Sequence, residues 1–281
     1  MSRSDDMRLS EEIVIDAGRL RAQYWHDLWR YRELFIFLAW RDLLVRYKQT
    51  VVGVGWALVR PLLGMLILTM VFGRFGNMPS GGVPYPLLVF CGLLPWQLFA
   101  SALTDSGNSL VANTGLISKV YFPRLIVPGC SVIISLADFL FSLAILVALM
   151  AWYRFVPPAT IVFLPLFVLL AIAASFGIGV WVAALTVKYR DFRVIVPLAV
   201  QFGLYISPVG FFSGVVPQEY RLLYSLNPMV GVIDGVRWSV LGGQNELYWP
   251  GLVASVVGVA ILLVTGIRYF RGTERNFADV I

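Results

Sequence analysis

This sequence of 281 residues has little of the side-chain chemistry on which metal binding and covalent catalysis depend. It holds one histidine, His26, and two cysteines, Cys91 and Cys130, which lie in or beside apolar runs. One histidine argues against a histidine-based metal site. Cysteines in such surroundings are typical of small buried side chains, although the sequence leaves a disulfide between them open.

Charge is also scarce. Charged residues make up 14% of the chain and hydrophobic residues 59%, with a mean hydropathy of +0.79. A soluble domain has about a quarter of its residues charged, so the composition indicates an integral membrane protein. The net charge of +6 then fits anionic lipid headgroups and basic cytoplasmic loops better than a nucleic acid partner. Residues 1–24 are polar and carry both signs of charge, so we expect no secretory signal there.

A nucleotide-binding loop is missing as well. The Walker A loop needs glycine before its lysine and serine or threonine after it. Lys48 lies between tyrosine and glutamine, Lys119 between serine and valine, and Lys188 between valine and tyrosine. We therefore expect no catalytic residue, metal or cofactor in this chain, and any ATP hydrolysis must come from another chain.

Long apolar runs are what the sequence does contain. Six segments approach the 20 or so residues that a membrane-spanning helix needs. Most lysines and arginines precede the first segment, follow the last, or lie in the second-to-third and fourth-to-fifth connections, which places both termini in the cytoplasm. The other side holds only Arg74, Arg154, Arg221 and Arg237. We predict a cytoplasmic segment, 1–50, and a transmembrane domain, 51–281, with spans at 51–72, 86–103, 125–152, 160–187, 194–212 and 249–269.

A basic amphipathic helix is expected immediately before the first span. At about 100° per residue, one face is apolar and the other is polar, so the helix would lie on the membrane surface and lead directly into the span. The apolar face has Ile36, Trp40, Leu43, Leu44 and Tyr47, and off it lie Arg41, Asp42, Arg46, Lys48 and Gln49.

Residues 213–248 are too apolar for a solvated loop, and each half is too short to span. Two short re-entrant helices before the last span fit them best; the alternative is an amphipathic loop on the outer surface. Small residues recur every four positions in the fourth span, which predicts close helix packing, within one subunit or between two. They are Ala171, Ser175, Gly179 and Ala183.

Two ionisable residues lie inside expected spans. Arg60, about nine residues into the first span, either binds an anionic group such as a phosphate or extends to the cytoplasmic interface. Asp138 either binds a proton or cation, pairs with Arg60, or makes a structural hydrogen bond to a neighbouring helix.

Aromatic residues gather in two further places. The run 119–124 has basic residues around aromatic ones, which suits either docking into a cytoplasmic partner or interfacial anchoring. Aromatic residues near the outer face either stack on sugar rings or form the ordinary interfacial belt. They are Tyr205, Phe211, Phe212, Tyr220, Tyr224, Trp238, Tyr248 and Trp249.

The ordered set of motifs resembles the membrane subunits of ABC-2 type polysaccharide exporters, the permeases for O-antigen, capsule and teichoic acid. The resemblance runs from about residue 29 to residue 271. The matching stretches are Trp40-Arg41-Asp42, Arg46-Tyr47-Lys48-Gln49-Thr50-Val51-Val52-Gly53, Trp56-Ala57, Pro61-Leu62, Lys119-Val120-Tyr121-Phe122-Pro123-Arg124, Tyr189-Arg190-Asp191, Val196-Pro197, Tyr205-Ile206-Ser207-Pro208-Val209 and Asn227-Pro228-Met229.

The resemblance implies a homodimeric inner-membrane pore with two ATP-binding cassette subunits below it, which bind ATP and Mg. The substrate is a lipid-linked polysaccharide, with O-antigen the first choice, and residues 213–248 gate the outer exit. The resemblance also assigns residues to ATPase coupling and to the interface helix. These are Ser118, Lys119, Tyr121, Phe122, Pro123 and Arg124 for coupling, and Trp40, Arg41, Arg46 and Tyr47 for the interface helix.

We place the substrate path along the first and fifth spans, with Arg60, Tyr205, Phe211, Phe212 and Trp238 beside it. Arg60 departs from the family pattern, in which this position is usually neutral and polar. An ABC-2 exporter of small lipophilic compounds is the nearest alternative. An ion-coupled carrier would need more acids and inverted repeats, and a glycan-processing enzyme would need an acid–base pair.

Overall fold

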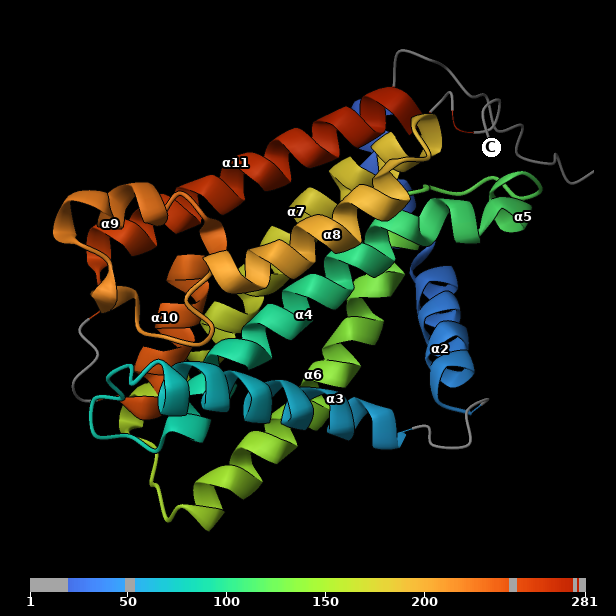
Figure 1. Cartoon of the computed structure of the whole chain (residues 1–281). Helices are drawn as coiled ribbons and strands as arrows, with labels where there is room; N and C mark the ends of the chain where they lie inside the picture. Colours follow the sequence, from blue (N-terminus) through green and yellow to red (C-terminus); the bar gives the residue numbers. More distant parts are fainter. Residues whose placement is uncertain (1–19, 49–53, 243–246, 275–276, 278–281) are drawn as a thin grey trace, which may run out of the picture.

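The computed structural model describes residues 20–48, 54–242, 247–274 and 277. Within these ranges the chain is helical and has no strand, as the sequence predicts. The long helices form one bundle, with short helices gathered at its two ends (Figure 1). Residues 49–53, where the surface helix was expected to lead into the first span, lie outside the described ranges.

Five helices are long and apolar enough to cross a membrane. They confirm five of the expected spans. In chain order they are Gly55–Phe75, which joins most of α3 (Val54–Leu68) to η1 (Thr69–Phe75); α4 (Tyr85–Ala112); α6 (Ile126–Trp152); Ala159–Lys188, which joins η2 (Ala159–Phe163) to α7 (Leu164–Lys188); and α11 (Trp249–Thr273).

The remaining expected span, 194–212, is a helix of only 15 residues, α8 (Phe192–Ile206). The helix ends where Ser207 turns to an extended conformation, with φ −82° and ψ 153°. Pro208 follows, and a proline disfavours the helical conformation of the residue before it. At 1.5 Å per residue α8 is about 22 Å long, shorter than the hydrocarbon layer of about 30 Å.

Helix α4 is the centre of the bundle and packs against α6, α7 and α10 (Pro228–Leu241). Its contact with α7 is close because small residues meet there. A Cβ atom added to Gly179 would lie 2.8 Å from the Cβ of Ser106. The small-residue stripe of α7 therefore packs within this chain at Gly179, against α4.

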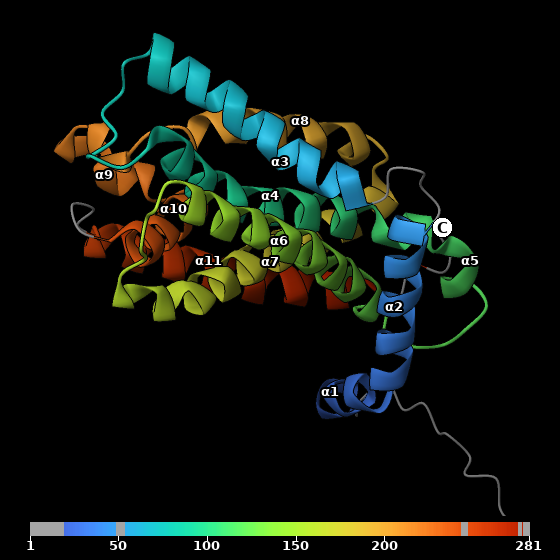
Figure 2. The ribbon, with the colours of Figure 1, turned by 90° about the horizontal axis from the view of Figure 1, so that it is seen from below.

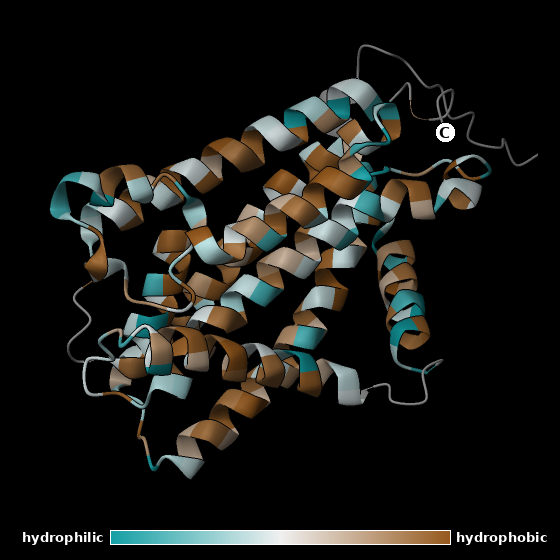
Figure 3. Cartoon of the chain, in the orientation of Figure 1, coloured by the Kyte–Doolittle hydropathy of each residue, from teal (hydrophilic) through white to brown (hydrophobic). Residues whose placement is uncertain are grey.

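The two ends of the bundle differ in character. At one end α2 (Arg32–Lys48) runs across the long helices, next to α1 (Leu20–Arg30) and near α5 (Thr114–Ile117) (Figures 1 and 2). At the other end lie α10 and α9 (Gln218–Tyr224). Apolar residues run along the long helices, and hydrophilic residues are most frequent towards the ends (Figure 3). This pattern is typical of a bundle whose middle lies in lipid.

Between residues 213 and 242 the chain forms two short helices, α9 and α10, after a single turn, η3 (Ser213–Val215). Asn227 caps α10 by accepting a hydrogen bond from the N–H of Met229 at 3.1 Å. Most of α10 is buried against α4, α7 and α11. Arg237, which the sequence analysis counted among the charges of the outer side, is buried and only 1% exposed.

Candidate functional sites

Helix α2 contacts the bundle through both apolar and polar residues. Leu38 and Ala39 are buried between it and the rest of the chain, whereas Ile36, Phe37 and Trp40 are more than half exposed. These three exposed side chains therefore point away from the protein, where lipid would cover them. The amphipathic pattern predicts the helix, and the structure adds that Tyr47, from the expected apolar face, and Arg46, from the polar side, both contact the bundle.

Two arginines of α2 fasten it to the bundle. The Nη1 of Arg46 lies 2.9 Å from Oδ2 of Asp105, and its Nη2 lies 2.6 Å from Oδ2 of Asp138. The hydroxyl of Tyr47 donates a hydrogen bond to Asp138, and Arg41 donates to Asn113 at 3.0 Å. Of the three roles considered for Asp138, the structure shows a contact with a neighbouring helix and no pairing with Arg60.

Burial opposes the charge of Arg46, but the carboxylates of Asp138 and Asp105 outweigh burial and raise the pKa of the guanidinium above its ordinary value. Arg46 therefore stays charged. Asp105 and Asn113 were not among the candidate residues, because the second span was expected to end at residue 103. The signal was present in Leu110 and Val111, which continue the apolar pattern beyond it.

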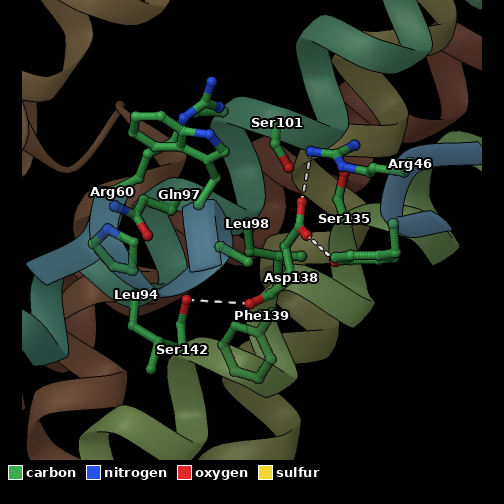
Figure 4. Close-up of a pocket in the computed structure, with 15 residues that line it drawn as sticks. Arg46, Arg60, Leu94, Gln97, Leu98, Ser101, Ser135, Asp138, Phe139 and Ser142 are labelled. Atoms are coloured by element: carbon green, nitrogen blue, oxygen red, sulfur yellow. Dashed lines mark hydrogen bonds and ion pairs between the residues drawn. The ribbon is translucent and has the colours of Figure 1, made fainter. Parts of the chain in front are cut away.

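A cavity of about 510 Å³ lies between α2, α3, α4 and α6. Figure 4 shows Arg46 and Asp138 on one side of it and Arg60 on the other. Arg60 is six residues, or about 9 Å, beyond Val54, where the described part of α3 begins, and is exposed.

The predicted coupling segment has an exposed part and a buried part. Ser118, Lys119 and Tyr121 are exposed, and Tyr121 is 70% exposed. Phe122 is 3% exposed and Pro123 is also buried. A partner chain docking here would therefore meet the side chains before Phe122, while Phe122 anchors the segment in the core.

Arg124 is held by the end of α11. Its backbone N–H donates to Oε1 of Glu274 at 2.7 Å, its guanidinium donates to the carbonyl of Glu274, and the ring of Phe277 lies 5.9 Å from it. These contacts make Arg124 a residue that positions the segment. Glu274 was not identified from the sequence, because nothing local links positions 150 residues apart.

We predict that the amide variant Glu274→Gln removes a pH dependence of stability. Burial raises the pKa of the Glu274 carboxyl, although the N–H of Arg124 opposes the shift. A raised carboxyl pKa gives stability that is complete below the ordinary value of about 4.3 and is lost as pH rises through the raised value. Thermal unfolding of the purified protein between pH 4 and 8 should show this decline in wild type and not in Glu274→Gln.

The control for that prediction is Asp191→Asn, an amide replacement of an exposed acid at the same end of the bundle. It should unfold with the wild-type pH profile. Identical profiles for wild type and Glu274→Gln would contradict the role of burial at this carboxyl.

At the opposite end of the bundle, Arg237 joins three segments. Its Nη1 and Nη2 each lie 2.6 Å from a carbonyl oxygen, those of Phe211 and Val209, and its Nε donates to the carbonyl of Leu88 at 3.3 Å. Gly92 leaves room for this arrangement, since a Cβ there would lie 2.7 Å from Nη2. Arg237 thus fixes α10 to α4 and to the segment after α8.

The aromatic residues proposed for the substrate path have different surroundings. Tyr205 is exposed on α8. Phe211 packs against Phe72, with ring centroids 5.9 Å apart, and Phe212 lies 5.6 Å from the guanidinium of Arg237. Trp238 packs between the rings of Phe163 and Phe167. The structure does not bring these four side chains and Arg60 into one site within the chain.

Comparison with known proteins places the chain in a family. The family model described as "ABC-2 type transporter" matches residues 33–241, from α2 through α10. The chain belongs to the ABC-2 type transporter family. It is a multi-pass membrane protein, and the matched region includes the α2 contacts, the cavity, the coupling segment and Arg237.

Curated members of the ABC-2 family are similar to it over most of their length. The O-antigen export system permease protein RfbA of Klebsiella pneumoniae is 28% identical, covering 89% of this chain and 95% of that protein. RfbA of Myxococcus xanthus is 29% identical, covering 91% and 98%. The polysialic acid transport protein KpsM of Escherichia coli is 25% identical, covering 79% and 89%.

Proposed function

We propose that this ABC-2 family member is the membrane subunit of an ATP-driven exporter that moves a lipid-linked polysaccharide across the cell inner membrane. The first candidate for this polysaccharide is O-antigen. The observation that carries the proposal is the end-to-end similarity to proteins named as O-antigen export permeases. The similarity to the polysialic acid transport protein KpsM supports the wider class of polysaccharide substrates.

The proposed assembly is two copies of this chain with two ATP-binding cassette subunits, which bind ATP and Mg. No Walker A lysine is present in the sequence, so the chain would act as a permease without catalytic residues. In this arrangement α8 serves as a short sixth span, both termini face the cytoplasm, and α9 and α10 enter the outer leaflet. The division into residues 1–50 and 51–281 stays a prediction.

The substrate is tested with the chain and its ATPase subunit reconstituted together in lipid vesicles. We expect ATP hydrolysis to increase when lipid-linked polysaccharide is added and to stay at its basal rate with small lipophilic drugs. Stimulation by drugs alone would contradict the proposal and favour the second class of ABC-2 exporter.

The coupling assignment is tested by Tyr121→Ala. Tyr121 presents a large exposed ring beside Lys119 and Val120, and truncating such a ring at the centre of an interface weakens binding by about tenfold or more. Binding of the ATPase subunit to the detergent-purified chain measures the effect.

The matched control is Trp152→Ala, which truncates an equally exposed ring, 83% exposed, at the far end of α6. It should leave binding unchanged. Wild-type affinity in Tyr121→Ala would remove the coupling role from this segment.

A further inference from the structure

We propose that the cavity between α2, α3, α4 and α6 binds the phosphate group of a membrane lipid, with Arg60 as its charged contact. The inference depends on α3 crossing the membrane and does not depend on which substrate is exported. The phosphate can belong to a bulk phospholipid or to a polyprenyl phosphate, and the experiment below separates the two.

Arg60 differs from the other arginines near the cavity in having its guanidinium available. Arg46 pairs with two carboxylates, and Arg41 pairs with Asp42 and donates to Asn113. Arg60 makes no ion pair or hydrogen bond with any residue that the structure describes. A planar guanidinium whose N–H groups are not bonded to the described residues is suited to bidentate contact with phosphate oxygens.

Neutral donors line the cavity beside Arg60. Gln97 and Ser101 are one turn apart on α4, so their side chains share one face of that helix. Neither side chain forms a hydrogen bond with the described residues. Gly64 brings α3 close to α4, because a Cβ there would lie 3.1 Å from Leu93 and 4.0 Å from Nε2 of Gln97. Gly64 follows Arg60 by one turn of α3, so the amide of Gln97 lies about one helical turn along α3 from Arg60.

The position of the cavity along the bundle matches the depth of lipid phosphates. Arg60 is about 9 Å from Val54, the first residue of α3 that the structure describes, and an arginine side chain can extend several ångströms further towards the interface. Helix α2, whose exposed face is apolar, borders the same cavity. Leu94, Leu98 and Phe139 give the cavity apolar walls for the first part of a lipid chain.

Asp138 is the acidic residue that lines the cavity, and its charge is compensated. Arg46 pairs with it at 2.6 Å and Tyr47 donates a hydrogen bond to it. Asp138 also lies across the cavity from Arg60 in Figure 4. The part of the cavity next to Arg60 thus attracts anions, and the part next to Asp138 is already neutralised.

The test is native mass spectrometry of the full chain in detergent with added lipids. Wild type should retain phosphatidylglycerol or a polyprenyl phosphate at least tenfold better than Arg60→Gln does. Diacylglycerol and the polyprenol, which lack the phosphate, should bind wild type and Arg60→Gln equally. Competition between the two phosphate lipids on wild type identifies the source, and preference for either supports the site.

Two further variants keep the result interpretable. Arg193→Gln removes an exposed charge near the start of α8 and should retain phosphate lipids as wild type does. Ser101→Ala should lose severalfold, because it removes one neutral donor. Equal retention by wild type and Arg60→Gln, or equal loss in Arg193→Gln and Arg60→Gln, would overturn the proposal.

Discussion

Replacing Arg237 by alanine is expected to destabilise the protein by roughly 3 kcal/mol or more. The buried guanidinium donates to three backbone carbonyls from two separate segments, and each buried acceptor left without a donor costs about 1–3 kcal/mol. The segment after α8 would lose its main connection to α10. We expect a lower temperature of thermal unfolding in detergent and a loss of export in cells.

Two further substitutions serve as comparisons for Arg237→Ala. Arg237→Lys should lie between wild type and alanine, because an ammonium group cannot reproduce the fork of a guanidinium. Arg74→Ala, which removes an exposed arginine at the end of η1, should change the unfolding temperature little. A wild-type unfolding temperature for Arg237→Ala would show that other donors satisfy these carbonyls.

Replacing Asp138 by alanine is expected to release α2 from the bundle. Asp138 accepts contacts from both Arg46 and Tyr47, and hydrogen bonds to a charged group contribute about 1.5–3 kcal/mol each. The pair is partly buried, with Asp138 25% exposed and Arg46 34%, so it should exceed the 0.2–1 kcal/mol typical of exposed pairs. Amide hydrogen exchange should become faster along α2.

The matched control is Asp105→Asn, which removes the second carboxylate of Arg46 and leaves the contacts of Asp138 in place. Its exchange rates along α2 should stay nearer wild type. A double-mutant cycle of Arg46→Gln and Asp138→Asn should give a coupling energy of about 1–2 kcal/mol. Additive effects of the two substitutions, or unchanged exchange in Asp138→Ala, would contradict the role of this pair.

Apolar run length predicts where most of the helices are, but it fails at their ends. Helix α4 continues to Ala112, although Asp105 and Asn108 interrupt the apolar pattern. Asn108 donates to a carbonyl of its own helix at 3.1 Å, and Asp105 meets Arg46. In the sequence, polar residues that form hydrogen bonds or ion pairs within the bundle look like the start of a loop.

The sequence predicts the candidate sites only in part, because a sequence pattern relates neighbouring residues and not distant ones. Amphipathic spacing predicts α2 and places Arg46 off its apolar face, since both depend on neighbours in the chain. The partners of Arg46 lie 59 and 92 positions away, and only packing of α2 against α4 and α6 brings them together. The same limit applies to Arg237. Its partners are backbone carbonyls, which the amino-acid sequence does not reveal.

The glycines of α7 limit how this protein can change shape. Gly179 faces Ser106 of α4, and Gly177 faces the backbone of α11, where a Cβ would lie 2.8 Å from the N of Leu263. Turning α7 about its axis would drive larger side chains into both neighbours, and packed interiors resist such compression. We therefore expect helices α4, α7 and α11 to move together as one rigid body. Helices α3 and α8 have large exposed apolar faces at the edge of the bundle, so we expect any hinge motion to involve these two helices.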